Sequence, residues 1–563
     1  MKLSILLTLS ILILQGPGVA IGSPVAPNQI PVGNDEALVY ISEQEDVRIW
    51  GSQLTLAPGK PDENLVRDPW IECESVKDPV CDFAKPNYNP SASINLGKCE
   101  NGASENCLVG LRVKRDGVLL PAEFISAVPG TKTFPAVPEL GLFDTGAASL
   151  FDVPGAPHSG GTLYLAGARV TSNYDAKTKR FVHTDMYVTI YPVALQGQNL
   201  SRPGANSCLW NYENQCWEAV PFPKGLTFGV ELRVVNELGG WFLGRFQSPN
   251  IQVAKFSNTN NQMVVDAEPV EVPRFAYLTK KSELTAADKI AVGNVGGTNA
   301  LFEDRPARLG NDGFDTSVFG MLAHFKDRVS DTATATTSHW RMRTTSRNGG
   351  NKCLTQYDKV LGIVSTNATA YDGFAPQFKD GYLDYKVAGL HYSPDGKTLN
   401  VGTYDLVISS ETARCLYGFT NAPVSATVTV VGTGDQNVAS TVVSEKDGWL
   451  KLAAYGFTFS EKEIKVKLSQ PLTKSLSEFS GSSKTLSAKQ KNEVSALMKK
   501  VSSNPKFICT GTYVKPADKA IALSRAKAVC NYAKGIDKNH SFFAQAKQTK
   551  AASYDGKVLI SSK

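Results

Sequence analysis

The stretch that decides the fold is Leu226-Thr-Phe228-Gly-Val230-Glu-Leu232-Arg-Val234, in which every second residue is apolar. The residues between them are Thr, Gly, Glu and Arg. This alternation is typical of a β-strand with one face buried and the other in water. Turn signals recur around the stretch at intervals that suit two packed antiparallel sheets. We therefore predict a β-sandwich-like domain over residues 131–275.

The same alternation returns further along the chain. Val424, Ala426, Val428 and Val430 are separated by Ser and Thr, and Asp447-Gly448 is a turn sequence. These patterns predict a second β-rich domain with its connector over residues 276–472. The preceding region, 24–130, is rich in Pro, Asn, Ser and Gly and carries four cysteines, so we expect it to be held mainly by disulfides.

The first residues predict export. Met1-Lys2 is followed by an apolar run from Leu3 to Leu14 and then by small residues, which is the pattern of a secretory signal peptide over residues 1–23. No second apolar run is long enough to cross a bilayer, so we expect no transmembrane segment in the mature chain. The expected location is the cell wall, the cell surface or the extracellular space.

The ten cysteines all lie beyond the predicted signal peptide, and their even number agrees with an oxidising compartment. No C-x-x-C is present, which argues against zinc ribbons and thioredoxin-like chemistry. We predict five disulfides: Cys73 with Cys81, Cys99 with Cys107, Cys208 with Cys216, Cys353 with Cys415, and Cys509 with Cys530. For the first four cysteines the pairing 73 with 107 and 81 with 99 stays open, because spacing does not fix connectivity.

The end of the chain, residues 485–563, has the pattern of a small α/β domain. Ser487-Ala-Lys-Gln490 resembles a capping box, and an amphipathic helix follows it. A short strand at 507–509, a second helix over about 518–533 and strands at 541–543 and 557–560 complete the predicted order. Residues 473–484 read as a linker to this domain. The predicted fold class is thus mainly β and multidomain, with antiparallel sandwich-like units and this C-terminal α/β domain.

Two strings in this domain carry a family resemblance: Ala520-Ile-Ala-Leu-Ser-Arg525-Ala-Lys527-Ala-Val-Cys-Asn-Tyr532 and Gly556-Lys557-Val-Leu-Ile560. They resemble a shortened OmpA-like, peptidoglycan-associated domain. In that family a helix arginine and an aspartate at the end of the preceding strand hold the diaminopimelate of the wall peptide. The resemblance implies that Arg525 binds peptidoglycan, with Lys527 and Lys557 as auxiliaries. The aspartate has no counterpart, because its position reads Thr510-Gly-Thr512.

A structural role for Arg525 is the alternative, as a helix arginine that pairs with a carboxylate such as Asp518. A second resemblance concerns residues 130–472, which look like uncharacterised secreted bacterial proteins with a similar tail. It rests on Ala413-Arg-Cys-Leu-Tyr-Gly-Phe419 and Gly448-Trp-Leu-Lys-Leu452. It implies an organisation of domains and no particular chemistry.

Charge is distributed unevenly along the chain. Residues 485–563 contain 15 basic and 4 acidic residues, a net charge of +11, whereas the rest has 44 basic and 49 acidic residues, a net charge of −5. A cationic end on an acidic body predicts attraction to a polyanion, here peptidoglycan or another anionic wall polymer. A solubilising lysine-rich surface is the alternative. Nucleic acid is not expected as a partner, because aromatic residues are not interleaved with the lysines.

One motif points to a different function. Leu142-Phe-Asp144-Thr-Gly146 resembles the Asp-Thr-Gly signature of pepsin-like aspartic proteases, in which two such loops bring together carboxylates that share a proton. The nearest second candidate is Phe314-Asp315-Thr-Ser317, where a serine replaces the glycine. A chain with 47 glycines will supply an Asp-Thr-Gly turn between strands by chance, and we take the motif to be such a turn. A secreted hydrolase that uses Asp144 and Asp315 is therefore the alternative function.

Other chemistry finds no support in the sequence. The six histidines show no metal-ligand spacing, and neither a phosphate-binding loop nor a nucleophile elbow is present. Trp210, Trp217 and Trp241 suit either a sugar-binding platform or core packing beside Cys208 and Cys216. We expect no catalytic residues, metal or cofactor. The function predicted from sequence is that of a non-catalytic, exported cell-envelope protein attached to the wall by its basic C-terminal domain.

Overall fold

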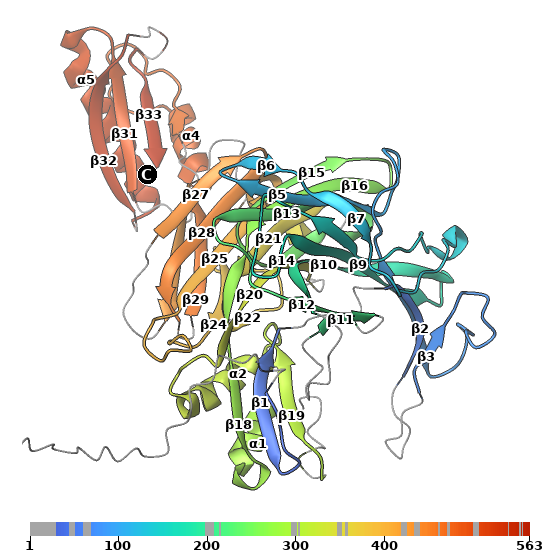
Figure 1. The fold of residues 1–563 in the computed structure, drawn as a ribbon. Helices are drawn as coiled ribbons and strands as arrows, with labels where there is room; N and C mark the ends of the chain where they lie inside the picture. Colours follow the sequence, from blue (N-terminus) through green and yellow to red (C-terminus); the bar gives the residue numbers. More distant parts are fainter. Residues whose placement is uncertain are drawn as a thin grey trace, which may run out of the picture.

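A computed structural model gives the fold of the chain (Figure 1). It describes residues 27, 30–43, 51–59, 69–196, 208–212, 215–293, 301, 304–345, 352–354, 359–417, 425–432, 440–459, 462–469, 473–498, 506–538, 540–550, 553 and 555–562. The predicted signal peptide, residues 1–23, lies outside the described residues. The fold is mainly β, with several largely antiparallel sheets, as the alternating patterns predicted.

One large sheet forms the centre of the molecule. Its hydrogen-bonded path runs through β27 (Ser440–Lys446), β28 (Trp449–Thr458), β25 (Val401–Ser409), β21 (Val360–Thr366), β14 (Gly240–Arg245), β20 (Ala335–Thr344), β10 (Arg180–Gln196), β9 (Leu163–Asp175), β4 (Tyr88–Asn95), β2 (Gln53–Pro58) and β3 (Ile71–Cys73). Five more strands attach to this path: β7 (Glu123–Ala127), β8 (Ser149–Asp152), β11 (Cys208–Tyr212), β12 (Gln215–Ala219) and β17 (Val270–Arg274).

A five-stranded sheet covers one face of the large sheet. Its strands are β15 (Gln247–Lys255), β16 (Asn260–Glu268), β13 (Leu226–Val235), β5 (Cys107–Arg115) and β6 (Val118–Leu120). The alternating stretch Leu226–Val234 lies in its middle strand, β13, with Phe228, Val230 and Leu232 fully buried. These side chains pack against Trp340 and Met342 of the large sheet. The two sheets therefore pack face to face, with the apolar residues of β13 in the core between them, and both sheets include strands from outside the predicted range 131–275.

A second sheet covers the opposite face of the large sheet near its β25 end. It consists of β22 (Ala370–Tyr371), β24 (Tyr382–Ala388), β29 (Lys462–Ser469), β26 (Ser425–Gly432) and β23 (Gln377–Lys379). On β25, Leu406 and Ile408 pack toward this sheet, whereas Val407 joins the other core. The centre of the molecule therefore has three layers, and α3 (Ser410–Tyr417) follows β25 at its edge. Strands buried on both faces lose the simple alternation of a half-wet strand.

A small three-stranded sheet lies at one end of the molecule (Figure 1). In it β1 (Glu36–Ser42) lies between β18 (Ala276–Lys280) and β19 (Ala307–Asp312), and α1 (Ala286–Val292) and α2 (Ser317–Phe325) complete its core. β1, from the predicted N-terminal region, thus pairs with two strands of the predicted second β-rich domain. The predicted boundary at 275 is bridged by β14, which pairs with β20 and β21. The boundary at 130 is bridged too, because β4 pairs with β9. Alternation identifies strands locally, but it does not say with which distant strand each one pairs.

The C-terminal domain is a four-stranded sheet with two helices, and it lies apart from the small three-stranded sheet in Figure 1. The strands run in the order β30 (Thr473–Ser475), β33 (Val558–Ser562), β31 (Lys506–Tyr513) and β32 (Ser541–Gln548). The helices are α4 (Ala488–Met498) and α5 (Lys519–Ile536). From α4 onward the elements follow the predicted order. At the start of α4, Ser487 and Gln490 exchange the hydrogen bonds of a capping box.

The predicted linker, 473–484, is instead part of this domain. Its first residues form β30, which pairs with β33. Leu476 and Phe479 are buried in the core of the domain, at 1% and 8% exposure. The short Gly-Ser sequence that suggested a linker is therefore preceded by apolar anchors, and the domain begins at about residue 473.

All five predicted disulfides are confirmed, including the local pairing of the first four cysteines: Cys73–Cys81, Cys99–Cys107, Cys208–Cys216, Cys353–Cys415 and Cys509–Cys530. The Cα–Cα distances, 5.0 to 5.8 Å, lie in the usual range for such bonds. Within the described residues, no helix is both long enough and apolar enough to cross a membrane.

Candidate functional site

The Asp-Thr-Gly loop packs tightly against the end of β4. The carboxylate of Asp144 accepts a hydrogen bond from the Ala136 N–H at 3.0 Å. The Gly146 N–H donates to the Asn95 carbonyl at 2.7 Å, and a Cβ on Gly146 would lie only 2.4 Å from the Cα of Gly97. The glycine is thus required by a close approach of two backbones, which gives the motif a structural explanation.

Asp315 serves a different local structure. It lies between β19 and α2, and its carboxylate accepts a hydrogen bond from the Ser317 N–H at 2.9 Å, at the first turn of the helix. Asp144 lies ahead of β8, which belongs to the large sheet, whereas β19 belongs to the three-stranded sheet. No contact between the two carboxylates exists in the described part of the chain. The described structure therefore does not assemble the paired acids that an aspartic protease requires.

The three tryptophans do not form one platform. Trp210 and Trp217 stack at 6.2 Å within the hairpin of β11 and β12, which the Cys208–Cys216 disulfide closes. Trp241 is 5% exposed and packs in a different core, with Leu243. These contacts support the packing role over the sugar-binding one.

Arg525 is buried inside the C-terminal domain, at 5% exposure. Its guanidinium donates to the carbonyls of Ser483 at 2.8 Å and Gly556 at 3.0 Å, and also to that of Gly481. The same group lies 5.0 Å from the ring of Phe479. These bonds fasten the segment before α4 and the turn before β33 to helix α5. The predicted contact of Arg525 with peptidoglycan is therefore not available to a buried side chain that three carbonyls already engage.

The two predicted auxiliaries lie apart from each other. Lys557 follows Gly556 and makes a 3.8 Å ion pair with Glu478, so it lies near Arg525. Lys527 is exposed, because residues two apart on a helix point in nearly opposite directions. The strand position that lacks the family aspartate is also explained, since a Cβ on Gly511 would lie 1.9 Å from the Ala522 carbonyl oxygen. Close packing of α5 on β31 excludes any side chain there.

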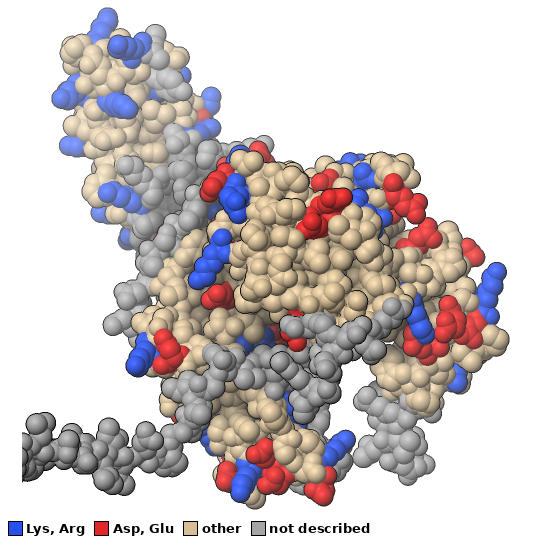
Figure 2. Space-filling view, viewed as in Figure 1, with Lys and Arg blue, Asp and Glu red and all other residues tan. Residues whose placement is uncertain are grey.

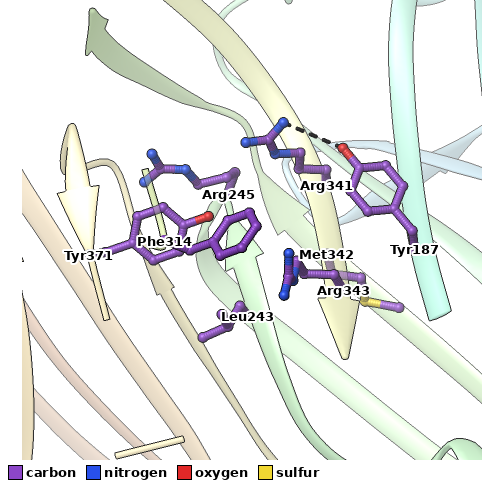
Figure 3. A pocket seen from close by; sticks show the side chains of 8 residues that line it. All are labelled: Tyr187, Leu243, Arg245, Phe314, Arg341, Met342, Arg343 and Tyr371. Atoms are coloured by element: carbon purple, nitrogen blue, oxygen red, sulfur yellow. Dashed lines mark hydrogen bonds between the residues drawn. The ribbon is translucent and has the colours of Figure 1, made fainter. Parts of the chain in front are cut away.

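A cationic pocket lies on one face of the large sheet (Figure 3). We call it the arginine pocket, and its lining residues are Tyr187, Leu243, Arg245, Phe314, Arg341, Met342, Arg343 and Tyr371. Across β14 and β20, Arg245 is paired with Arg341 and Leu243 with Arg343, so the three arginines share one face. Phe314 and Tyr371 come from the segments that cover this face, and their rings lie beside the guanidinium groups in Figure 3.

Glu43 binds two of the three arginines. Arg245 donates to it from Nε at 3.2 Å and from a terminal nitrogen, and Arg341 forms an ion pair with the same carboxylate. Arg245 also donates to the Thr366 carbonyl at 2.8 Å. The three charged residues are at most 6% exposed. Since Glu43 directly follows β1, this buried cluster joins the three-stranded sheet to the large sheet, and removal of one partner would leave a buried charge uncompensated.

Arg343 carries the remaining charge of the arginine pocket. It is half-buried, its guanidinium carbon lies 3.8 Å from the centroid of the Phe314 ring, and its Nε donates to the Thr344 carbonyl at 3.4 Å. Within the described ranges, no carboxylate pairs with Arg343. The terminal nitrogens of this side chain therefore keep their hydrogen-bonding capacity.

Electrostatics keep the arginine pocket positive. Burial lowers the pKa of Arg341 to about 10, which still leaves the group charged at neutral pH. On the same face of β20, burial and then the charges of Arg274 and Arg245 hold the pKa of His339 well below its usual value, so this histidine is neutral. Among the described residues, the Glu43 carboxylate pairs with Arg245 and Arg341, and Arg343 adds a third guanidinium group to the lining of the pocket. Arginine forks bind carboxylates and phosphates through paired N–H groups, so this arrangement suits an anion.

A second polar cluster connects β25 to the five-stranded sheet. Asp405 is 4% exposed, and its carboxylate accepts hydrogen bonds from the Tyr455 hydroxyl and, at 3.2 Å, from the Ser248 N–H. Burial raises the pKa of Asp405 to about 7, against these hydrogen bonds, and the nearby charges of Glu268 and Lys451 act in opposite directions. Asp405 is thus an acid that titrates near neutral pH inside the fold.

Neither cluster was predicted from the sequence. The string His339-Trp-Arg341-Met-Arg343 alternates basic and apolar residues, which predicts a strand with one cationic face that would normally face water. Glu43 and Arg245 lie 202 positions apart, so no local pattern links them. Only the pairing of strands brings them together. Among the described residues, no group of three or more His, Cys, Asp or Glu side chains is placed to hold a metal ion.

Comparison with known proteins gives no assignment: no family model matches the chain, and a search of curated proteins finds no match.

Proposed function

We propose that this protein is a non-catalytic, exported cell-envelope protein that attaches to peptidoglycan or another anionic wall polymer through its C-terminal domain. The contact surface in this proposal is the lysine-rich exterior of the domain, and Arg525 has an internal, supporting role. The β-rich body is the part that the C-terminal domain holds at the wall. The OmpA-like resemblance supports this proposal through the sequence strings quoted above.

The observation that carries the proposal is a set of exposed lysines that have no acidic partner among the described residues. Among the described residues, the C-terminal domain has twelve exposed lysines that make no salt bridge, and they are Lys474, Lys484, Lys489, Lys491, Lys506, Lys515, Lys519, Lys527, Lys534, Lys538, Lys547 and Lys550. Figure 2 shows many basic and few acidic side chains on the visible face of this domain, whereas both kinds mix on the body. Unpaired surface lysines attract polyanions over about 10 Å at moderate salt.

Helix α5 places several of these lysines on one side of the domain. Lys527 and Lys534 are seven residues apart and therefore lie on one stripe of the helix, on the side away from the buried Arg525. Lys538 follows the end of the helix and is also exposed. This row of three lysines lies outside the core that Arg525 stabilises. A linear anionic polymer is a suitable partner for such a row, because it binds several charges at once.

Cosedimentation of the full-length protein with isolated peptidoglycan sacculi tests the proposal. The variant Lys527→Gln/Lys534→Gln/Lys538→Gln removes the row, and its affinity should fall by roughly tenfold, since each lysine near an anionic surface contributes about 1 kcal/mol or less. Binding of the unmodified protein should weaken as salt is raised.

A matched variant controls for loss of charge alone. Lys177→Gln/Lys224→Gln/Lys397→Gln removes three exposed lysines from the body and should leave binding unchanged. Equal losses in the two triple variants, or binding that salt does not affect, would contradict the proposed contact surface. Absence of binding at low ionic strength would remove the proposal altogether.

A further inference from the structure

We propose that the arginine pocket in the β body binds the carboxylate group of a ligand, with Arg343 as the residue that contacts it. This site is separate from the wall-binding surface of the C-terminal domain and does not depend on it. The proposal rests on three features: an excess of positive charge, a guanidinium that is already held in position, and a cavity of limited size.

The excess of charge comes from unequal numbers of arginines and acids. Arg245 and Arg341 share the carboxylate of Glu43, while Arg343 has no acidic partner within the described residues. A cation that is partly removed from water without a partner is costly. An anion that enters beside Arg343 would offset this cost.

Arg343 is held ready for such a contact. Its guanidinium lies over Phe314, with the guanidinium carbon 3.8 Å from the ring centroid. Its Nε donates a hydrogen bond to the Thr344 carbonyl. Stacking on an aromatic ring leaves the edge of the guanidinium, with its terminal N–H groups, available for an anion. A ligand therefore meets a group that loses little side-chain freedom on binding.

The size of the cavity limits the ligand. Its volume is about 10 Å³, close to that needed by one water molecule. An oxygen of a planar carboxylate fits such a space, whereas a bulky group does not. The walls of Phe314, Leu243 and Tyr371 are mostly apolar, so they favour a group whose polar atoms point at the arginines. Cationic ligands are excluded by the charge of the pocket.

Arg343 also sets the direction of entry. It is half-buried, whereas Arg245 and Arg341 are almost completely enclosed. In Figure 3 the guanidinium of Arg343 lies below the ring of Phe314, on the side away from Arg341. The carboxylate therefore enters at Arg343, and the rest of its molecule stays outside the cavity.

The test uses the full-length protein and N-acetylglycine as the probe, with acetate for a free carboxylate and N-acetylglycinamide for the same molecule without charge. Saturation-transfer NMR at fixed ionic strength measures binding. We expect N-acetylglycine and acetate to bind and the amide not to bind. Tighter binding of N-acetylglycine than of acetate would indicate a terminal carboxylate of a larger ligand, and equal binding a small free carboxylate.

Variants test whether Arg343 is the residue that binds N-acetylglycine. Arg343→Ala should weaken binding of N-acetylglycine by about tenfold or more, and Arg343→Lys by a smaller factor, because a lysine lacks the paired N–H groups. Arg115→Ala removes an exposed arginine from the edge of the five-stranded sheet and should change nothing. If Arg343→Ala fails to fold, Phe314→Leu, which removes the stacking surface, should weaken binding instead.

Two results would overturn the proposal. The first is binding of the amide as strong as that of the acid. The second is an unchanged affinity of folded Arg343→Ala for N-acetylglycine, which would show that the carboxylate binds at another site.

Discussion

The β body and the C-terminal domain carry positive charge in opposite ways. In the body, Arg245 and Arg341 are buried and share one glutamate. In the C-terminal domain the charge is carried by exposed lysines such as Lys527, and the one arginine, Arg525, is internal. Buried guanidinium groups depend strongly on their partners, whereas solvated lysines hardly affect the fold. The body therefore contains charge that fixes its structure, whereas the terminal domain exposes most of its charge to solvent.

The distribution of tryptophans allows the two regions to be followed separately. All seven tryptophans lie before residue 473, at positions 50, 70, 210, 217, 241, 340 and 449. Tryptophan fluorescence therefore reports unfolding of the body alone. Far-UV circular dichroism records the whole chain, and α4 and α5 are the longest helices among the described residues, so a helical transition without a change in tryptophan fluorescence reports on the terminal domain.

The largest effect is expected from Glu43→Gln. This change leaves Arg245 and Arg341 buried without their shared carboxylate, which should lower the free energy of unfolding of the body by about 3–5 kcal/mol. Urea unfolding followed by tryptophan fluorescence measures it. The matched change in the terminal domain is Glu478→Gln, which removes the 3.8 Å ion pair with the half-buried Lys557 and should cost less than about 1 kcal/mol. Similar losses of unfolding free energy in both variants would contradict the difference proposed between buried charge in the body and exposed charge in the terminal domain.

A smaller effect is expected from the pH dependence of Asp405. Its pKa is about 7 in the fold against an ordinary value of 3.8, so the folded protein keeps a proton that the unfolded chain loses between these pH values. The free energy of unfolding should therefore fall as pH rises from about 4 to about 7, by on the order of 3 kcal/mol.

Asp405→Asn isolates this contribution. The amide cannot ionise, and its oxygen can still accept the Ser248 N–H. The variant should gain stability relative to the unmodified body as pH rises from about 4 to about 8. A difference between the two proteins that does not vary with pH would show that Asp405 keeps an ordinary pKa. The transition of the terminal domain serves as an internal reference.

The smallest effects compare two neighbours on α5. Arg525→Gln removes the donors to the carbonyls of Gly481, Ser483 and Gly556 and should destabilise the terminal domain by about 2–3 kcal/mol. Lys527→Gln should change its stability by less than about 0.5 kcal/mol, because the side chain is exposed. Circular dichroism during thermal unfolding measures both. If Arg525→Gln left the stability of the terminal domain unchanged, the supporting role of Arg525 would be contradicted, and a role in ligand binding would again have to be considered.

Sequence patterns predicted the elements better than their boundaries. The alternation of β13 and the amphipathic spacing of α4 are local properties, and both elements are confirmed. Helix α5 was expected to end at about residue 533 but continues to Ile536, and a glycine in an exposed last turn costs only about 1 kcal/mol relative to alanine. The linker prediction was wrong. It relied on a short Gly-Ser sequence and did not consider the apolar residues Leu476 and Phe479, which are buried in the core of the domain.

Prediction of the candidate site was less successful. The sequence string around Arg525 singled out an arginine that stabilises the domain. Only the fold shows that its side chain is buried in the domain. The charge count found the cationic character of the terminal domain, because exposed charge needs no partner to be recognised. The arginine pocket was not predicted, because it depends on Glu43, Arg245 and Arg343, which are far apart in the chain.

By itself, the sequence determined the mainly β class, the order of elements from α4 onward and the cationic end, and it predicted the three disulfides beyond Cys107 without a stated alternative. These properties follow from local spacing and from composition. Only the tertiary structure decided that β1 joins strands near residue 300, that Arg525 is internal and that three arginines meet on one face. The physical reason is that strand pairing and burial depend on residues hundreds of positions apart, and no local pattern records which distant strand a given strand will meet.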